Sequence, residues 1–213
     1  NAALAYENES KATKEIFDVE FPYQITNEKQ IKDEIKGEKK LTFDDIFIKS
    51  SNIGSIKLLD FMGYEKQKDF FKRIGLTENL DISGLKIVSN NLPNYWNATA
   101  SKFISFGYGI SISPISLASS FSTLVNGGFK ITPTISLEES NPVKRILDTK
   151  TSRKINNLLE RIVEEGTGKK AKVLGLEVGG KTGTSEKFVD GNYNSEKVIT
   201  SFIGVFPIEE PKY

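Results

Sequence analysis

Two short runs carry the side chains that could do chemistry in this chain. The first is Ser50-Ser51-Asn52, and the second, far downstream, is Lys181-Thr182-Gly183-Thr184. A serine hydroxyl is a weak nucleophile, and a lysine can serve as its base only when burial or a second cation lowers the lysine pKa. The sequence has no His and no Cys, which excludes a Ser/His/Asp triad, a cysteine nucleophile and a His- or thiolate-ligated metal. Acyl transfer by this chain would therefore use Ser or Thr with Lys.

We expect the two runs to lie on opposite sides of one cleft. Across it, Lys181 could bond the Ser50 hydroxyl and relay protons toward a leaving amine, while its charge favours a neutral partner lysine. The Asn52 amide could orient a lysine and hold a peptide backbone. We therefore predict that Ser50, Asn52 and Lys181 line one cleft, within about one water-bridged hydrogen-bond reach of each other.

The second run is predicted to lie on a strand of an antiparallel hairpin. The pattern favours strands over 177–186 and 198–206, joined by a loop that contains Asp190-Gly191. On such a strand Gly183 would let a ligand approach the backbone closely. The hydroxyls of Thr182 and Thr184 could then hold a terminal carboxylate.

Local signals predict the elements that position the first run. Thr42 and Asp45 have the spacing of a capping box, which starts a short helix toward Ile48. Apolar residues three or four apart predict a second helix over 52–62 that ends at Gly63, so Ser50 falls at a junction between two helices. Three further helices are expected: over 1–8, from Ser113-Pro114 to about 125, and over about 151–165. Residues 17–25 are expected to form an irregular edge strand or loop. Residues 30–40 are expected to form an exposed turn.

Length and charge limit the class of protein. The 213 residues are the size of one domain and contain no repeat or linker-like stretch. A net charge of +1, from 29 basic and 28 acidic residues, gives no field that would attract nucleic acid. No apolar run approaches the roughly 18 residues needed to span a bilayer.

The two runs resemble the S-x-N and K-T-G-T motifs of the penicillin-binding proteins. The stretch from Ser105 to Pro114, with the helix-like segment that follows into Asn126-Gly127-Gly128, resembles the region between these motifs in the class B enzymes of cell division and elongation. The resemblance covers essentially all 213 residues. It implies an α/β (α+β) fold, the penicillin-binding transpeptidase and serine β-lactamase-like fold, in which helices flank an antiparallel sheet.

The resemblance also implies where the nucleophile lies. In this family it comes from an S-x-x-K motif at the start of a helix, and residues 1–8 look like the continuation of that helix. We therefore expect residues 1–213 to be a partial transpeptidase domain that lacks the S-x-x-K segment and the C-terminal strand, and to be inactive alone.

The implied reaction is D,D-transpeptidation in peptidoglycan synthesis. A stem peptide ending in D-Ala-D-Ala acylates the active-site serine and is passed to a neighbouring amine, and β-lactams mimic the substrate. Ser50, Asn52 and Lys181 would be catalytic, Thr182, Gly183 and Thr184 would bind substrate, and the Thr184 N–H would be one oxyanion donor.

No metal or organic cofactor is implied. The implied setting is the periplasmic face of the bacterial inner membrane, with a glycosyltransferase and other divisome or elongasome membrane proteins as partners and no nucleic acid.

Two related functions stay open. A serine β-lactamase shares the motif order, but it needs a base for the deacylating water, and no E-x-x-x-N type loop lies between the two motifs. A non-catalytic β-lactam sensor would bind the drug without turnover. Deacylation and transpeptidation assays would separate these functions.

Three further stretches match known motifs in their letters but not in their expected secondary structure. Residues 175–182 fit the phosphate-loop pattern G-x-x-x-x-G-K-[ST], but no helix is expected after Thr182, so nucleotide binding is a remote alternative. Ser83-Gly84-Leu85-Lys86 is a formal S-x-x-K, and Ser89-Asn90-Asn91 is a formal S-x-N. Because only two residues separate them, they could not converge on one carbonyl from different elements, and we expect both in loops.

Overall fold

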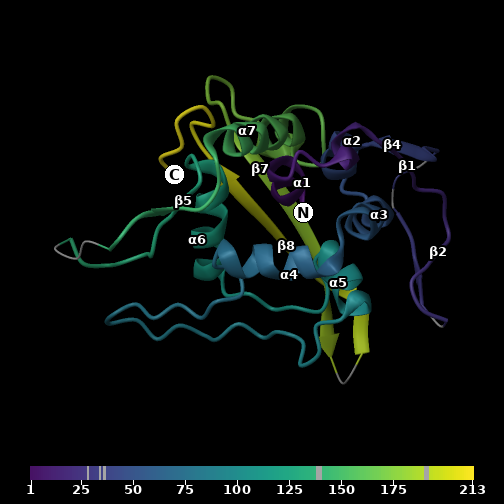
Figure 1. Cartoon of the computed structure of the whole chain (residues 1–213), viewed down its shortest axis with the longest axis horizontal. Coiled ribbons are helices and arrows are strands. Elements are labelled where there is room, and N and C mark those ends of the chain that lie inside the picture. Colours follow the sequence, from purple (N-terminus) through teal and green to yellow (C-terminus); the bar gives the residue numbers. More distant parts are fainter. Residues whose placement is uncertain (28, 34, 36, 138–140, 190–191) are drawn as a thin grey trace.

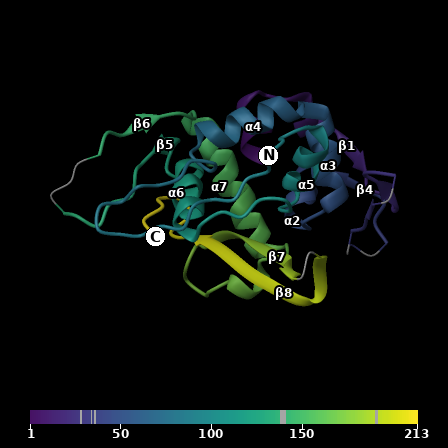
Figure 2. The same ribbon diagram turned by 90° about the horizontal axis from the view of Figure 1, so that it is seen from below.

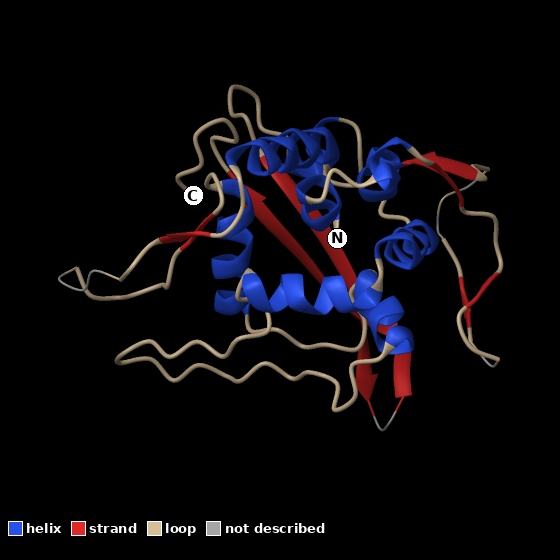
Figure 3. Cartoon of the chain, viewed as in Figure 1, coloured by secondary structure: helices blue, strands red, loops and turns tan. Residues whose placement is uncertain are grey.

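The computed structural model combines helices with antiparallel strands and describes residues 1–27, 29–33, 35, 37–137, 141–189 and 192–213 (Figures 1 and 3). The α-helices are α1 (Ala2–Glu7), α2 (Phe43–Ile48), α3 (Asn52–Met62), α4 (Tyr64–Arg73), α5 (Ala98–Ser105), α6 (Pro114–Val125) and α7 (Thr149–Glu164). Among the described residues, two short 3₁₀ helices are η1 (Lys11–Lys14) and η2 (Lys169–Ala171). Within the described ranges, no helix is both long enough and apolar enough to cross a bilayer.

In the part of the chain that the structure describes, the strands form antiparallel pairs. They are β1 (Ile16–Asp18) with β4 (Lys40–Thr42), β2 (Tyr23–Gln24) with β3 (Gln30–Ile31), β5 (Phe129–Lys130) with β6 (Lys144–Arg145), and β7 (Gly179–Val189) with β8 (Asn192–Val205). The β7–β8 ladder is the longest, with a register shift between Glu186 and Lys187. This mixture of helices and antiparallel strands confirms the α+β class expected from the sequence.

Helix α7 is the element on which the long ladder rests. Asp148 caps its first turn by accepting the Thr151 N–H, and its buried face repeats every three or four residues, over Ile155, Leu158, Leu159 and Ile162. This helix packs against β7 (Figure 2) and also contacts α1, α2 and α6. The position of β7 relative to the other helices therefore depends on α7.

Helices α2 and α3 place the first run. Thr42 and Asp45 form the expected capping box, each side chain accepting the other's backbone N–H. Helix α3 begins at Asn52 and ends before Gly63, as predicted. The two helices bury Phe43, Ile46, Ile48, Ile53, Ile56 and Leu58 in one hydrophobic core.

Other expectations were met in part. The α6 cap at Ser113-Pro114 is confirmed, and α7 covers 149–164 instead of 151–165. Strands β7 and β8 are longer than predicted, and the expected turn at Asp190-Gly191 lies outside the described residues. The expectation of a plain exposed turn over 30–40 was wrong, because this segment contains β3, the start of β4 and the buried Ile31. Over 17–25, the expected irregular strand is divided between β1 and β2.

The loop after α7 contacts the last turn of α2 through a glycine. A Cβ built on Gly166 would lie 2.4 Å from the Ile48 carbonyl oxygen and 2.9 Å from that of Ile162. The next residue, Thr167, donates its N–H to the same Ile48 oxygen at 3.1 Å. The end of α7 is thus held against the backbone just before Ser50.

We predict that Gly166→Ala lowers the free energy of unfolding by about 2 kcal/mol, because the added methyl group must push backbone atoms apart. Gly168→Ala is the matched control in the same loop, since its Cβ would approach no atom closer than 3.0 Å. It should cost less than about 1 kcal/mol. Urea unfolding of both variants measures the difference. Equal costs would show that the close approach of the two helix ends is not a packing constraint.

Candidate active site

Ser50 and Lys181 meet across the fold, although they come from distant parts of the chain. The Lys181 Nζ donates a hydrogen bond to the Ser50 Oγ at 2.8 Å and another to the Thr182 carbonyl at 3.1 Å. Ser50 lies between α2 and α3, whereas Lys181 lies on β7, paired with Ile203 of β8. The predicted convergence of this pair and the predicted strand position of Lys181 are both confirmed.

The backbone at Ser50 adopts a conformation that few non-glycine residues adopt. Its φ is +59°, in the left-handed region. The Ser51 N–H donates to the Ile46 carbonyl at 2.8 Å, which closes the end of α2, and Ser51 then caps α3. This sharp reversal lets one helix end and the next begin within three residues, and it leaves Ser50 exposed between them.

Asn52 is the first residue of α3 and is held from the side of the 30–33 segment. Its Nδ2 donates to the Lys32 carbonyl at 3.2 Å. Within the described part of the chain, it forms no hydrogen bond with Ser50 or Lys181. Its expected convergence with these two residues therefore stays a prediction.

A cavity of about 460 Å³ extends from Asn52. This volume is in the range of small-molecule sites in proteins. Its lining includes Glu186, which lies five residues beyond Lys181 on β7, but it does not include Ser50 or Lys181. The lining residues are Lys29, Gln30, Ile31, Lys32, Asn52, Pro93, Ala100, Phe103, Phe106, Tyr108, Gly109 and Glu186.

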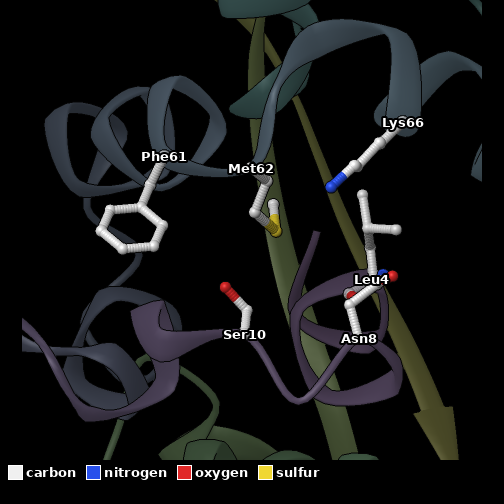
Figure 4. Close-up of a pocket in the computed structure, with 6 residues that line it drawn as sticks. All are labelled: Leu4, Asn8, Ser10, Phe61, Met62 and Lys66. Carbon is white, nitrogen blue, oxygen red and sulfur yellow. The ribbon is translucent and has the colours of Figure 1, made fainter.

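A second, much smaller cavity is unrelated to the two runs. It has a volume of about 60 Å³ and lies between the N-terminal segment and the α3–α4 region (Figure 4). It is lined by Leu4, Asn8, Ser10, Phe61, Met62 and Lys66. This volume has room for a few water molecules but not for a peptide.

Burial sets the protonation of Lys181. Loss of solvent around its ammonium group lowers the pKa of Lys181 from 10.5 to about 8. No ion pair within the described ranges offsets this effect at Lys181. A lysine with this pKa exchanges a proton readily near neutral pH, as a proton relay requires.

The three residues after Lys181 lie in different surroundings. The Thr182 hydroxyl donates to the exposed Thr167 hydroxyl at 2.9 Å, so its proton is used in this bond. A Cβ on Gly183 would lie 2.6 Å from the Ser201 Oγ, so a side chain there would require the Ser201 hydroxyl to rotate away. Thr184 is exposed, and its hydroxyl bonds to none of the described residues. Of the two threonines, Thr184 is the one whose hydroxyl is open to a ligand.

Two residues at the site were missed in the sequence. Thr167 links β7 to α2, because it contacts both the Thr182 hydroxyl and the Ile48 carbonyl. Asp33 accepts hydrogen bonds from Ser51 and from the first backbone amides of α3. Asp33 lay within a charged run that gave no local signal, whereas the two glycines flanking Thr167 were a signal for close packing.

The formal motif matches have structural explanations. Ser83 and Gly84 occupy a tight turn, in which the Leu85 N–H donates to the Ile82 carbonyl at 3.0 Å. Asn91 pairs its backbone with Ser111. The phosphate-loop alternative is wrong, because Thr182 is inside β7 and not at a helix N-terminus.

A family model described as "Penicillin binding protein transpeptidase domain" matches residues 1–213, and the chain belongs to this family. The predicted resemblance to the class B enzymes is confirmed. Among curated relatives, the probable peptidoglycan D,D-transpeptidase FtsI of Caulobacter vibrioides is 32% identical over 207 residues, covering 92% of this chain and 34% of the relative. Stage V sporulation protein D of Bacillus subtilis is 33% identical over 189 residues, covering 80% and 29%. The chain thus spans about a third of the length of these relatives.

Solved structures agree on the fold. The apo transpeptidase domain of Burkholderia pseudomallei penicillin-binding protein 3 matches with a TM-score of 0.87 and 28% identity, covering 99% of this chain and 65% of that one. Penicillin-binding protein 3 of Mycobacterium tuberculosis in complex with ampicillin has the same TM-score at 21% identity, covering 99% and 52%. At that identity the second likeness supports the fold alone.

Replacing Lys181 by Met should change how stability depends on pH. Because the folded-state pKa of about 8 is below the ordinary 10.5, the unfolded chain binds this proton more tightly. Below pH 8 the folded protein bears the full cost of a buried ammonium, and that cost disappears as pH rises from about 8 toward 10.5. We predict that the unfolding free energy of the unaltered protein, relative to Lys181→Met, rises by about 2 kcal/mol from pH 7 to pH 10. Urea unfolding across this range measures it.

The control for this prediction is Lys187→Met, which removes an exposed lysine from the same strand. Its unfolding free energy should follow that of the unaltered protein across the range. If the Lys181→Met and Lys187→Met curves were parallel, Lys181 would not be desolvated.

Proposed function

We propose that this chain is the part of a peptidoglycan D,D-transpeptidase that carries its second and third catalytic motifs. The observation that supports this most directly is the hydrogen bond between the desolvated Lys181 and Ser50. Asn52, two residues after Ser50, lines a cavity with the volume of a small-molecule site. The relatives from Caulobacter and Neisseria, named as probable peptidoglycan D,D-transpeptidases, support the same reaction. The substrate is a stem peptide that ends in D-Ala-D-Ala.

The reaction begins with acylation of a serine. Its oxygen attacks the carbonyl carbon of the penultimate D-Ala while the lysine of the same S-x-x-K segment takes its proton. The peptide C–N bond then breaks, and the terminal D-Ala leaves as an amine. Ser50 and Lys181 deliver the proton that this amine needs, since the pKa of Lys181 near 8 allows it to give up a proton and regain it. The amine of a second stem peptide then attacks the ester and releases the serine.

Ligand contacts come from the strand and the S-x-N turn. The donor peptide lies along β7 at Gly183, where no side chain blocks its approach. The exposed Thr184 hydroxyl bonds the terminal carboxylate, and the Thr184 N–H is one donor to the oxyanion. Thr182 contributes only if its hydroxyl leaves Thr167. Asn52 holds the peptide backbone with the part of its amide that Lys32 does not use.

The nucleophile in this proposal belongs to an S-x-x-K segment outside residues 1–213. The single S-x-x-K run in the sequence is Ser83–Lys86, and its serine and lysine are exposed residues in a loop. The 213 residues then form a partial domain that does not act alone. The complete protein works at the periplasmic face of the inner membrane, with a glycosyltransferase and other division or elongation proteins, and β-lactams inhibit it.

We predict that the natural protein, including its S-x-x-K segment, forms a covalent adduct with a fluorescent penicillin. Changing Lys181 to Ala should slow acylation by about 100-fold or more, because a proton relay and a positive charge are lost together. The matched control is Lys187→Ala, which should label at the unaltered rate. Residues 1–213 alone should form no stable adduct, and peptide mapping by mass spectrometry locates the modified serine.

Three results would contradict this assignment. Labelling that maps to Ser83 would mean that the loop serine is the nucleophile. Rapid hydrolysis of the adduct would indicate a β-lactamase. A stable adduct with no transfer to an amine from a thioester donor would indicate a sensor.

A further inference from the structure

The first turn of α3 has all of its free backbone amides bound by side chains. The first four amides at a helix N-terminus, counted from the cap residue, have no partner within the helix. At α3 the cap amide, that of Ser51, donates to the Ile46 carbonyl, and the other three belong to Asn52, Ile53 and Gly54. The Ser51 Oγ accepts the Gly54 N–H at 2.8 Å, as an ordinary N-cap does.

The other two amides are bound by a carboxylate that is distant in the sequence. One oxygen of Asp33 accepts the Asn52 N–H at 2.6 Å and the Ile53 N–H at 3.1 Å. The second oxygen accepts the Ser51 hydroxyl proton at 2.5 Å. A negative charge at a helix N-terminus is favoured by the helix dipole, and hydrogen bonds to a charged acceptor are stronger than neutral ones.

These contacts hold the S-x-N run to the 30–33 segment. Asp33 binds the backbone of Asn52, and the neighbouring Lys32 carbonyl binds its side-chain amide. Ser51 cannot move from Asp33 without moving Ser50, whose strained φ of +59° leaves it little freedom. The same segment forms part of the wall of the 460 Å³ cavity.

We propose that Asp33 is a positioning residue for acyl transfer, a role that rests on the proposed function. It does not touch substrate. It fixes the orientation and the axial position of the first turn of α3. This keeps the Ser50 hydroxyl within hydrogen-bond distance of Lys181, and it keeps the Asn52 side-chain amide at the wall of the cavity. Because Asp33 fills the N-terminus of this helix, the substrate carboxylate does not bind there.

The variants Asp33→Ala and Asp33→Asn test this role by removing different numbers of the Asp33 hydrogen bonds. The alanine removes every contact, whereas the isosteric amide can still accept the two backbone amides but not the Ser51 proton. In the natural protein we expect acylation by fluorescent penicillin to slow by on the order of 100-fold for Asp33→Ala and about 10-fold for Asp33→Asn, as expected for misplaced catalytic groups. The loss should fall on the maximal acylation rate more than on the concentration of penicillin that gives half of it.

The control is Asp148→Ala, which removes another helix-capping carboxylate far along the chain from the two runs. We expect it to lower the melting temperature as much as Asp33→Ala does, but to keep acylation within about twofold of the unaltered rate at a temperature where all variants are folded. A structural readout is amide hydrogen exchange. In Asp33→Ala, the Asn52 and Ile53 amides should exchange at least about tenfold faster than in the unaltered protein, and in Asp148→Ala they should not.

The outcomes separate the two proposals. If the unaltered protein fails to label, the proposed function is overturned, and with it the role of Asp33. If it labels, and Asp33→Ala acylates as fast as Asp148→Ala, only the role of Asp33 is overturned. Unchanged exchange at Asn52 and Ile53 in Asp33→Ala also overturns it, because the carboxylate would not be holding the helix.

Discussion

The distance between the β7 strand and the end of helix α2 is the constraint on which the site depends. A hydrogen bond of 2.8 Å between Lys181 and Ser50 tolerates little displacement of either element. The next strand residue is held to the same place, because Thr182 contacts Thr167, and Thr167 contacts the Ile48 carbonyl. Two consecutive residues of one strand are thus tied to one helix end, with α7 packed behind them.

The electrostatics of the site follow from how its charges are distributed. A carboxylate beside Lys181 would stabilise its ammonium form and raise its pKa. Instead, Asp33 is turned toward the amides of α3, and Lys181 is bonded to a neutral hydroxyl and a carbonyl. Desolvation is therefore not compensated, and it holds the pKa of Lys181 near 8. The uncompensated desolvation lowers the free energy of unfolding, and it also produces a lysine that can release its proton near neutral pH.

Local signals in the sequence predicted the elements well. These signals are the capping box at Thr42, the Ser113-Pro114 helix start and the apolar spacing of α3 and α7. Each depends on interactions between residues one or two helical turns apart, so a short stretch of sequence is enough to predict it. The Lys181–Ser50 pair was predicted from its resemblance to two motifs, and the structure brings the pair together. Asp33 could not be predicted, because its partners lie 18 to 20 residues away and nothing local distinguishes it from the charges around it.

The phosphate-loop match shows why the letters alone do not define the chemistry. A phosphate site needs several amides of a loop and a helix N-terminus to point at one place. Here the same glycines and lysine are in an extended strand, in which successive backbone groups point in opposite directions and one edge is paired with β8. Such a backbone cannot surround an anion, but it can present one lysine to a serine on a neighbouring element and leave an edge for an extended peptide. The segment that follows Thr182 decides between these two outcomes, because it continues the strand where a nucleotide site would need a helix.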